Sequence, residues 1–142
     1  MTKPPIRIVA ALITNGAGEV LLVRKRSSSI FIQPGGKYEP GEAPLDTLAR
    51  ELQEELGVEL VVASAVHLGE FEADAVNEPG RRVRADAYAC TVLGTPTARA
   101  EIEELAWVSA TAPAWVPVAP LSREHLMPAW LAWREAAARV GR

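Results

Sequence analysis

Residues 35–58 constrain this chain more than any other stretch, because they join a glycine-rich turn to a segment crowded with glutamate. Gly35 and Gly36 allow positive φ and close backbone approach, so they indicate a turn. Pro44 suits the first turn of a helix, and Gly57 suits a left-handed cap at its end. Strong helix formers fill the interval, so the sequence predicts a helix over 44–56.

The predicted helix has an apolar face and an acidic face, because its side chains repeat at about 100° per residue. One arc carries the apolar side chains of Leu45, Leu48, Ala49, Leu52 and Leu56. The adjoining arc carries Glu51, Glu54 and Glu55 at spacings i, i+3 and i+4, so their carboxylates converge. A solvated acidic surface is the usual role of a charged run. The alternative is a cation between the carboxylates, and oxygen ligands favour Mg²⁺ first and Mn²⁺ second.

The spacing of the whole stretch favours the cation. The pattern is G-x5-E-x7-R-E-U-x-E-E-x-G-U, where U is a bulky aliphatic residue. It is met by Gly36, Glu42, Arg50, Glu51, Leu52, Glu54, Glu55, Gly57 and Val58. A chance match at one starting position is on the order of one in a billion. This stretch resembles the Nudix box, and the chain resembles a MutT-like Nudix hydrolase.

The resemblance implies hydrolysis of a nucleoside diphosphate linked to another group, X, with a divalent metal at the site. It implies main metal ligands at Glu51, Glu54 and Glu55, and a further ligand in the carbonyl of Gly35. Arg50 is expected to orient a box glutamate through charge-assisted hydrogen bonds, the alternative being an ordinary surface ion pair. For Glu42, a structural role and a role in assisting the metal and the water remain equally open.

An acidic residue outside the box often acts as a base or an extra ligand in this family. The candidates are Glu101, Glu103 and Glu104. Glu101 is the first choice, because it precedes Trp107 by six residues in a pattern like that of several family members. Glu104 is the second choice, and a solvated acidic loop is the competing interpretation.

Substrate contacts are expected from Arg24, Arg26, Phe31 and Arg82. Arg24 and Arg26 would reach phosphates from the end of the strand before the box. Arg82 follows a predicted loop that covers the site, and Phe31 would stack on a base. The competing roles are ordinary surface exposure for the arginines and core packing for the aromatic ring.

The order of elements predicts an α/β fold, an α/β/α sandwich with a mixed sheet, and this is also the Nudix fold. A length of 142 residues favours a single domain over 1–142. Strands are predicted at 6–14, 19–24, 30–33, 59–62, 66–72, 83–93 and 104–108. A loop is predicted at 73–82 and an irregular segment at 109–120. A last helix is predicted over 121–140, with Ser122 as its N-cap and a buried stripe of Leu126, Trp130, Trp133, Ala137 and Val140.

The net charge of −3 argues against a nucleic-acid binder, because such binding rests on neutralising phosphates. No apolar run reaches membrane-spanning length and no signal peptide is evident. The single cysteine, Cys90, fits a reducing compartment, so we expect a cytoplasmic protein with a small-molecule nucleotide as partner. A monomer and a homodimer are both open.

The box implies a reaction class and leaves the group X open. We favour a nucleoside triphosphate, such as an oxidised purine dNTP, cleaved to the monophosphate and pyrophosphate. ADP-ribose, other nucleotide sugars and dinucleoside polyphosphates are alternatives. A non-catalytic nucleotide-binding regulatory module would be expected to have lost box glutamates, and none is missing here. An RNA-decapping pyrophosphohydrolase would need a basic path that this acidic chain does not show.

Overall fold

Strand β1 (Ile6–Ile13) lies at the centre of the fold in this computed structural model, which describes residues 3–111 and 115–140. It pairs in parallel with β7 (Arg82–Cys90) and antiparallel with β4 (Gly35–Lys37). Strand β6 (Val66–Asp74) pairs antiparallel with β7, so the sheet has the order β4-β1-β7-β6 and is mixed. Strand β1 is central in this sheet and is buried on both faces, which explains its nearly continuous apolar run.

A second sheet is antiparallel and has the order β3-β2-β9. It consists of β2 (Glu19–Lys25), β3 (Phe31–Ile32) and β9 (Ile102–Ser109). The turn from β1 to β2 depends on Asn15, whose side-chain oxygen accepts the backbone N–H groups of Ala17 and Glu19 at 3.0 Å each. A short pair of strands, β5 (Glu59–Leu60) and β8 (Val92–Leu93), completes the strand pairing.

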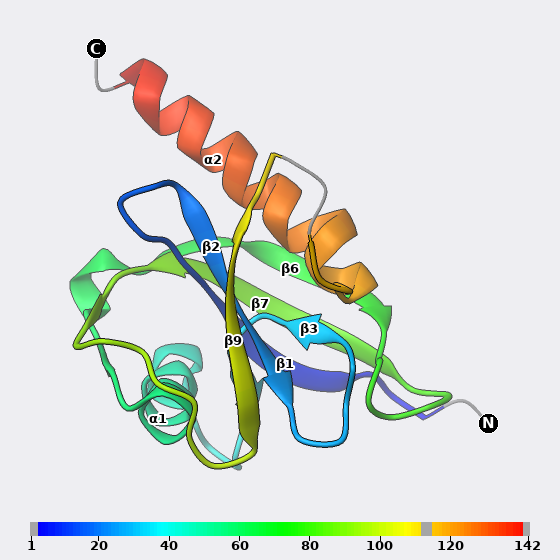
Figure 1. Cartoon of the computed structure of the whole chain (residues 1–142). Helices are drawn as coiled ribbons and strands as arrows, with labels where there is room; N and C mark the ends of the chain where they lie inside the picture. The colour runs from blue at the N-terminus through cyan, green and yellow to red at the C-terminus, as the bar shows by residue number, and fades with distance from the viewer. Residues whose placement is uncertain (1–2, 112–114, 141–142) are drawn as a thin grey trace.

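Helices cover both sides of the sheets (Figure 1). Helix α1 (Pro44–Leu56) packs Leu48, Leu52 and Leu56 against the odd-numbered buried residues of β1. The π-helix η2 (Leu121–Leu126) and α2 (Met127–Val140) pack against the other face. The two apolar cores are therefore separated by the sheets. This arrangement confirms the predicted α/β/α sandwich with a mixed sheet.

Helix α1 has the predicted bounds, and Gly57 ends it with a left-handed φ of 67°. The strands differ more. Residues 35–37 form a strand and not only a turn, because they pair with β1. The predicted strand over 83–93 is interrupted after Cys90, since its last residues leave β7 and pair with β5. The predicted strand over 59–62 ends at Leu60, and a 3₁₀ turn (Val62–Ser64) follows.

The last helical segment shows two further differences. It begins at Leu121 with Pro120 in the N-cap position, so the predicted cap at Ser122 is wrong. Its buried stripe includes Leu126 and Trp130 but not the predicted residues beyond them, namely Trp133, Ala137 and Val140. Figure 1 shows the reason, because the end of α2 extends past the sheets and has no apolar face to pack on.

The predicted irregular segment over 109–120 includes residues 112–114, which lie outside the described residues. After them, Val118 forms an isolated bridge with Phe31. Within the described part of the chain, no helix is both long and apolar enough to span a membrane.

Candidate active site

The acidic face of α1 lies beside its buried face, so its carboxylates are held at the edge of the core. Glu55 is 8% exposed, because it neighbours the fully buried Leu52 and Leu56 on the helix. The Glu51 side chain is 15% exposed, whereas 55% of the Glu54 side chain is exposed. The helix therefore presents one carboxylate inside the protein, one at its boundary and one in solvent.

The glycine turn contacts these carboxylates directly. The backbone N–H of Gly35 donates to Glu55 Oε1 at 3.1 Å. A Cβ on Gly36 would overlap the Glu51 carboxyl group and lie 2.6 Å from each of its oxygens. A Cβ on Gly35 would overlap the Val9 carbonyl oxygen, since β4 lies against β1. Both glycines are thus required by close approach: Gly36 to the helix and Gly35 to the central strand.

Arg50 connects the loop before α1 to the helix. Its guanidinium donates to Glu42 Oε2 at 2.9 Å and Oε1 at 2.8 Å, and to Glu51 Oε1 at 2.9 Å. It also donates to the Lys37 carbonyl oxygen at 3.2 Å. The hydrogen bonds that Glu42 accepts, first from Arg50 and then from the Glu39 N–H and Thr47, lower the pKa of Glu42 to about 2. Arg50 therefore joins three chain segments, namely β4, the loop before α1 and α1 itself, and is not an isolated surface ion pair.

Burial changes the proton affinity of two box glutamates. It raises the pKa of Glu55 to about 8, and the negative charge of Glu51 adds to this effect. The Gly35 N–H group and Lys25 oppose the shift without cancelling it. Burial also raises the pKa of Glu51, although the hydrogen bond from Arg50 lowers it. Burial is therefore the main reason that these two carboxyl groups hold their protons more tightly than they would in water.

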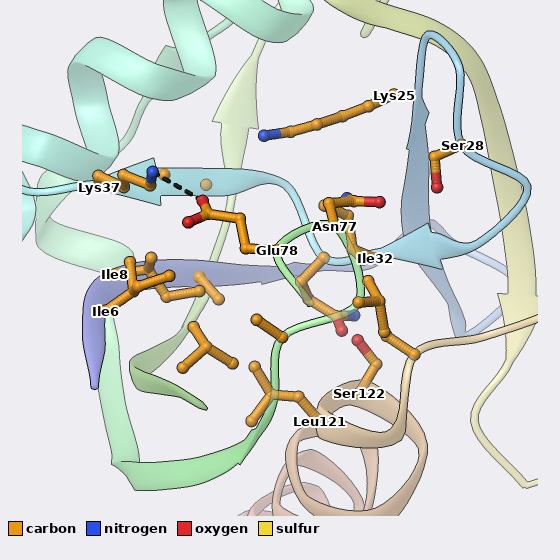
Figure 2. Close-up of a pocket in the computed structure, with 18 of the residues that line it drawn as sticks. Ile6, Ile8, Lys25, Ser28, Ile32, Lys37, Asn77, Glu78, Leu121 and Ser122 are labelled. Atoms are coloured by element: carbon orange, nitrogen blue, oxygen red, sulfur yellow. Dashed lines mark ion pairs between the residues drawn. The ribbon is translucent and has the colours of Figure 1, made fainter. Parts of the chain in front are cut away.

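A cavity of about 630 Å³ opens beside these carboxylates. Its lining includes ionisable side chains, namely Glu51, Glu55, Asp74, Glu78, Glu101, Lys25, Arg26 and Lys37. It also includes apolar side chains, among them Ile6, Ile8, Ile32, Val83 and Leu121. Figure 2 shows Lys25 and Lys37 in the upper half of the view and Ile8, Leu121 and Ser122 in the lower half. A volume of this size fits a small-molecule ligand.

Several residues expected from the sequence meet at this cavity. Glu51, Glu55, Gly35, Glu101 and Arg26 all line it. The backbone N–H of Arg26 donates to the Glu101 carbonyl oxygen at 2.8 Å, which joins the end of β2 to the loop before β9. The other acidic candidates lie elsewhere, since Glu103 pairs with Arg26 at 3.6 Å and Glu104 pairs with Arg24 at 3.2 Å.

Other expected residues do not line the cavity. Phe31 is 3% exposed within the core under η2 and α2, so its surroundings support packing and not stacking on a base. Arg24 bonds Glu104 and the Ser28 carbonyl, and Arg82 bonds Glu72 and Asp74. Glu54 lies 3.8 Å from Arg50 Nη1, and Glu42 is held by Arg50 and Thr47.

Sequence reasoning missed several cavity residues. Lys25 and Lys37 neighbour residues that we named, and a basic residue next to the box was the available signal. Gln33, Asn77 and Ser122 carried no signal, because they come from three distant segments that only the fold brings together. Lys37 also forms an ion pair with Glu78 at 2.8 Å, which joins β4 to the loop between β6 and β7 (Figure 2).

The donor set fits a hard divalent cation. Glu55 is a buried carboxyl beside a second carboxyl. A cation between them would stabilise the ionised form of Glu55, which burial disfavours most and the charge of Glu51 disfavours further. No three His, Cys, Asp or Glu side chains among residues 3–111 and 115–140 already form a ready-made metal cluster. The Glu51 carboxylate is hydrogen-bonded to Arg50, and the Glu54 side chain is exposed. A metal site with three carboxylates would therefore require Glu54 to turn towards the buried Glu55.

Comparisons with known proteins show the family of the chain. A family model described as NUDIX domain matches residues 4–133. A CTP pyrophosphohydrolase of Escherichia coli (strain K12) is 32% identical over 136 residues, which cover 92% of this chain and 95% of that protein. An 8-oxo-dGTP diphosphatase of Haemophilus influenzae is 36% identical over 76 residues, or 51% of this chain. That match spans 56% of the relative.

The fold has a solved counterpart of similar length. The solution structure of the E. coli ORF135 protein is 31% identical and matches with a TM-score of 0.73. The match covers 92% of this chain and 91% of that chain. Family model, full-length relative and fold thus agree with the motif at 36–58, and the chain belongs to the NUDIX family, the Nudix hydrolases.

Proposed function

We propose that this Nudix hydrolase cleaves a nucleoside triphosphate to the monophosphate and pyrophosphate, with Mg²⁺, or Mn²⁺ in its place. The observation that carries the proposal is the cavity whose lining brings the carboxylates of Glu51 and Glu55 together with basic and apolar side chains. Such a cavity suits a ligand with an anionic chain at one end and an apolar ring at the other. The relatives named for CTP and 8-oxo-dGTP both act on nucleoside triphosphates by their names, which supports this substrate class.

The proposed metal ligands are Glu51, Glu54, Glu55 and the Gly35 carbonyl. A divalent cation would supply charge neutralisation for the phosphates and a lower pKa for the attacking water. Arg50 is a positioning residue, because its bond to Glu51 Oε1 determines where that carboxylate lies. Glu42 in turn orients Arg50 through two hydrogen bonds.

The remaining steps fall to residues that line the cavity. Lys25 and Arg26 provide positive charge for the phosphate chain beside the carboxylates. Glu101 is the proposed base, and its carboxylate takes the proton of the attacking water. Its backbone carbonyl accepts a hydrogen bond from the Arg26 N–H, which fixes the backbone of Glu101 beside that of Arg26.

The test is a panel of nucleotides with and without Mg²⁺, in which phosphate and pyrophosphate are measured separately. We expect pyrophosphate and the nucleoside monophosphate in equal amounts, and no turnover in a chelator. ADP-ribose, a nucleotide sugar and a dinucleoside polyphosphate in the same panel test the alternative substrates. Turnover that persists in the chelator, or no hydrolysis of any nucleoside triphosphate, would contradict the proposal. A protein that binds nucleotides without turnover would instead be a regulatory module.

Cytoplasmic location and oligomeric state stay predictions. A small nucleotide is the proposed partner, and RNA is disfavoured by the acidic balance of the chain. Size-exclusion chromatography with light scattering distinguishes the monomer from the homodimer.

A further inference from the structure

Gln33 is a buried amide without a partner. Only 6% of the residue is exposed, and neither its side-chain nitrogen nor its oxygen has a hydrogen-bond partner among the described residues. Arg81 Nε is also unpartnered, but the same guanidinium donates to the Pro4 carbonyl oxygen through another nitrogen at 3.0 Å. Buried polar groups are almost always bonded, so a whole amide left unpaired calls for a ligand.

The position of Gln33 links this amide to the proposed active site. It lies between β3 and β4, two residues before Gly35, whose N–H group bonds Glu55. Two extended residues span about 7 Å, so the backbone of Gln33 is close to that of Gly35. Gln33, Glu51 and Glu55 line one cavity. Gln33 lines the same cavity as Ile32, Asn77, Leu121 and Ser122. Figure 2 shows Ile32, Leu121 and Ser122 together, apart from Lys25 and Lys37.

The chemistry of a primary amide limits what it can bind. It is uncharged, so it does not compensate phosphate, and the cavity lining supplies Lys25, Arg26 and Lys37 for that purpose. It presents an acceptor oxygen and donor N–H groups side by side in one plane. The matching partner is a planar group with a donor next to an acceptor, which describes the hydrogen-bonding edge of a nucleobase. The apolar residues around it would contact the faces of such a ring.

We infer that Gln33 determines base recognition, and that its amide hydrogen-bonds the edge of the substrate's nucleobase while the phosphates lie beside Glu51 and Glu55. The inference rests on the proposed function for the orientation of the nucleotide. It assigns to this chain a specificity residue outside the 36–58 motif. A carboxylate at the same place could only accept hydrogen bonds, and would favour an edge with two adjacent donors, such as N1–H and N2–H of guanine.

A structural role for Gln33 makes different predictions. If the amide were satisfied by buried water, it would support the fold, and its loss would lower the melting temperature without affecting base preference. If the amide is unpaired until a nucleobase binds, an apolar side chain of similar size should leave the free protein at least as stable as the wild type, because a buried unpaired amide is removed.

The experiment measures binding of AMP, GMP, CMP, UMP and ribose 5-phosphate by calorimetry in Mg²⁺. The proteins are the wild type, Gln33→Leu, Gln33→Glu and, as matched control, Gln53→Leu, which changes the other glutamine on the exposed face of α1. We expect the wild type to bind at least one nucleotide more tightly than ribose 5-phosphate. Gln33→Leu should weaken the binding of that nucleotide by about 5- to 150-fold, which is the range of one bidentate contact with a base. The affinity of Gln33→Leu for ribose 5-phosphate, and the nucleotide affinities of the Gln53→Leu control, should equal those of the wild type.

The two proposals fail separately. Equal weakening of nucleotide and ribose 5-phosphate, no weakening at all, or a wild type that never prefers a nucleotide would each overturn the role of Gln33. If Gln33→Glu binds GMP more tightly relative to the other nucleotides than the wild type does, the role of Gln33 is supported. If the order of nucleotide affinities in that variant is unchanged, the role is contradicted. The proposed function is decided by hydrolysis in the wild type, so turnover with unchanged base preference in Gln33→Leu would remove only the present inference.

Discussion

The guanidinium of Arg50 holds the carboxylate of Glu42 by two hydrogen bonds, Nε to Oε2 at 2.9 Å and Nη2 to Oε1 at 2.8 Å. The remaining nitrogen, Nη1, donates to Glu51. The loop before α1 therefore controls the orientation of a proposed metal ligand through a single side chain. This geometry also explains why arginine is needed, because lysine cannot form the planar two-bond contact.

Replacement of Arg50 by lysine should lower activity by about 10- to 100-fold, since a partner that orients a metal ligand is lost while the charge remains. The Mg²⁺ dependence of the rate should shift to higher concentration. Steady-state kinetics across a Mg²⁺ series is the measurement. Arg139→Lys is the matched control, because the one ion pair of Arg139 among the described residues is an exposed i,i+4 pair with Glu135. Equal kinetics in both variants would contradict the positioning role.

Gly36→Ala should displace the Glu51 carboxylate, because the added methyl group would occupy its place. The obstacle is the end of a flexible side chain, so the protein should still fold. We expect weaker Mg²⁺ activation and activity lowered by about tenfold or more. Gly16→Ala is the control, since a Cβ there meets nothing within 4 Å. A Gly36→Ala enzyme with normal Mg²⁺ activation would show that Glu51 need not lie against the turn.

Glu54→Gln should abolish Mg²⁺-dependent turnover, with a loss of at least about a hundredfold, because a charged metal ligand becomes neutral. The side chain is 55% exposed, so the free energy of unfolding should change by no more than about 0.5 kcal/mol. Activity assays and urea unfolding measure the two effects. Glu59→Gln, a similar change at an exposed position outside the motif, should be silent in both. Full activity in Glu54→Gln would exclude this ligand.

The buried carboxyl of Glu55 should make the metal-free protein less stable as pH rises. Its pKa of about 8 in the folded chain exceeds the ordinary value of 4.5, so the folded state binds this proton more tightly than the unfolded state. The resulting stabilisation is complete below about pH 4.5 and is lost as pH rises to about 8. Between pH 5 and pH 8, wild type should lose a few kcal/mol relative to Glu55→Gln.

Urea unfolding in a chelator across this pH range measures the effect for both proteins. The comparison cancels the titration of all other groups that the two proteins share. Parallel stability curves would show that Glu55 titrates normally. Metal binding to wild type at pH 7 should also release a proton, which calorimetry in buffers of different ionisation enthalpy detects.

Glu101→Gln should lower kcat by about 10²- to 10⁴-fold with little change in KM, because a general base contributes to the transition state and not to binding. The control is Glu104→Gln, whose carboxylate pairs with Arg24 at 3.2 Å, because neither of these residues lines the cavity. The pH profile of kcat separates the roles, since loss of the base should remove the acidic limb. If Glu104→Gln lowered kcat more than Glu101→Gln, the assignment of the base would be reversed.

The local elements of the motif were predictable from the amino-acid order. The helix over 44–56 has the predicted bounds, and its apolar face is buried at Leu48, Leu52 and Leu56. Helical periodicity, a proline at the start and a glycine at the end act within a few residues, so they are visible in the sequence. The same spacing placed Glu51 and Glu55 together and indicated the family.

Contacts between distant segments were not predictable in this way. The strand at 35–37 exists because β1 pairs with it, and α2 is exposed beyond Trp130 because the sheets end there. Phe31 was expected at a base, yet the face it occupies is under the last helix. Gln33, Asn77 and Ser122 reach one cavity from three segments. Residue order specifies helix faces and turns through short-range forces, whereas cavity walls depend on how whole elements pack, and no local spacing encodes that.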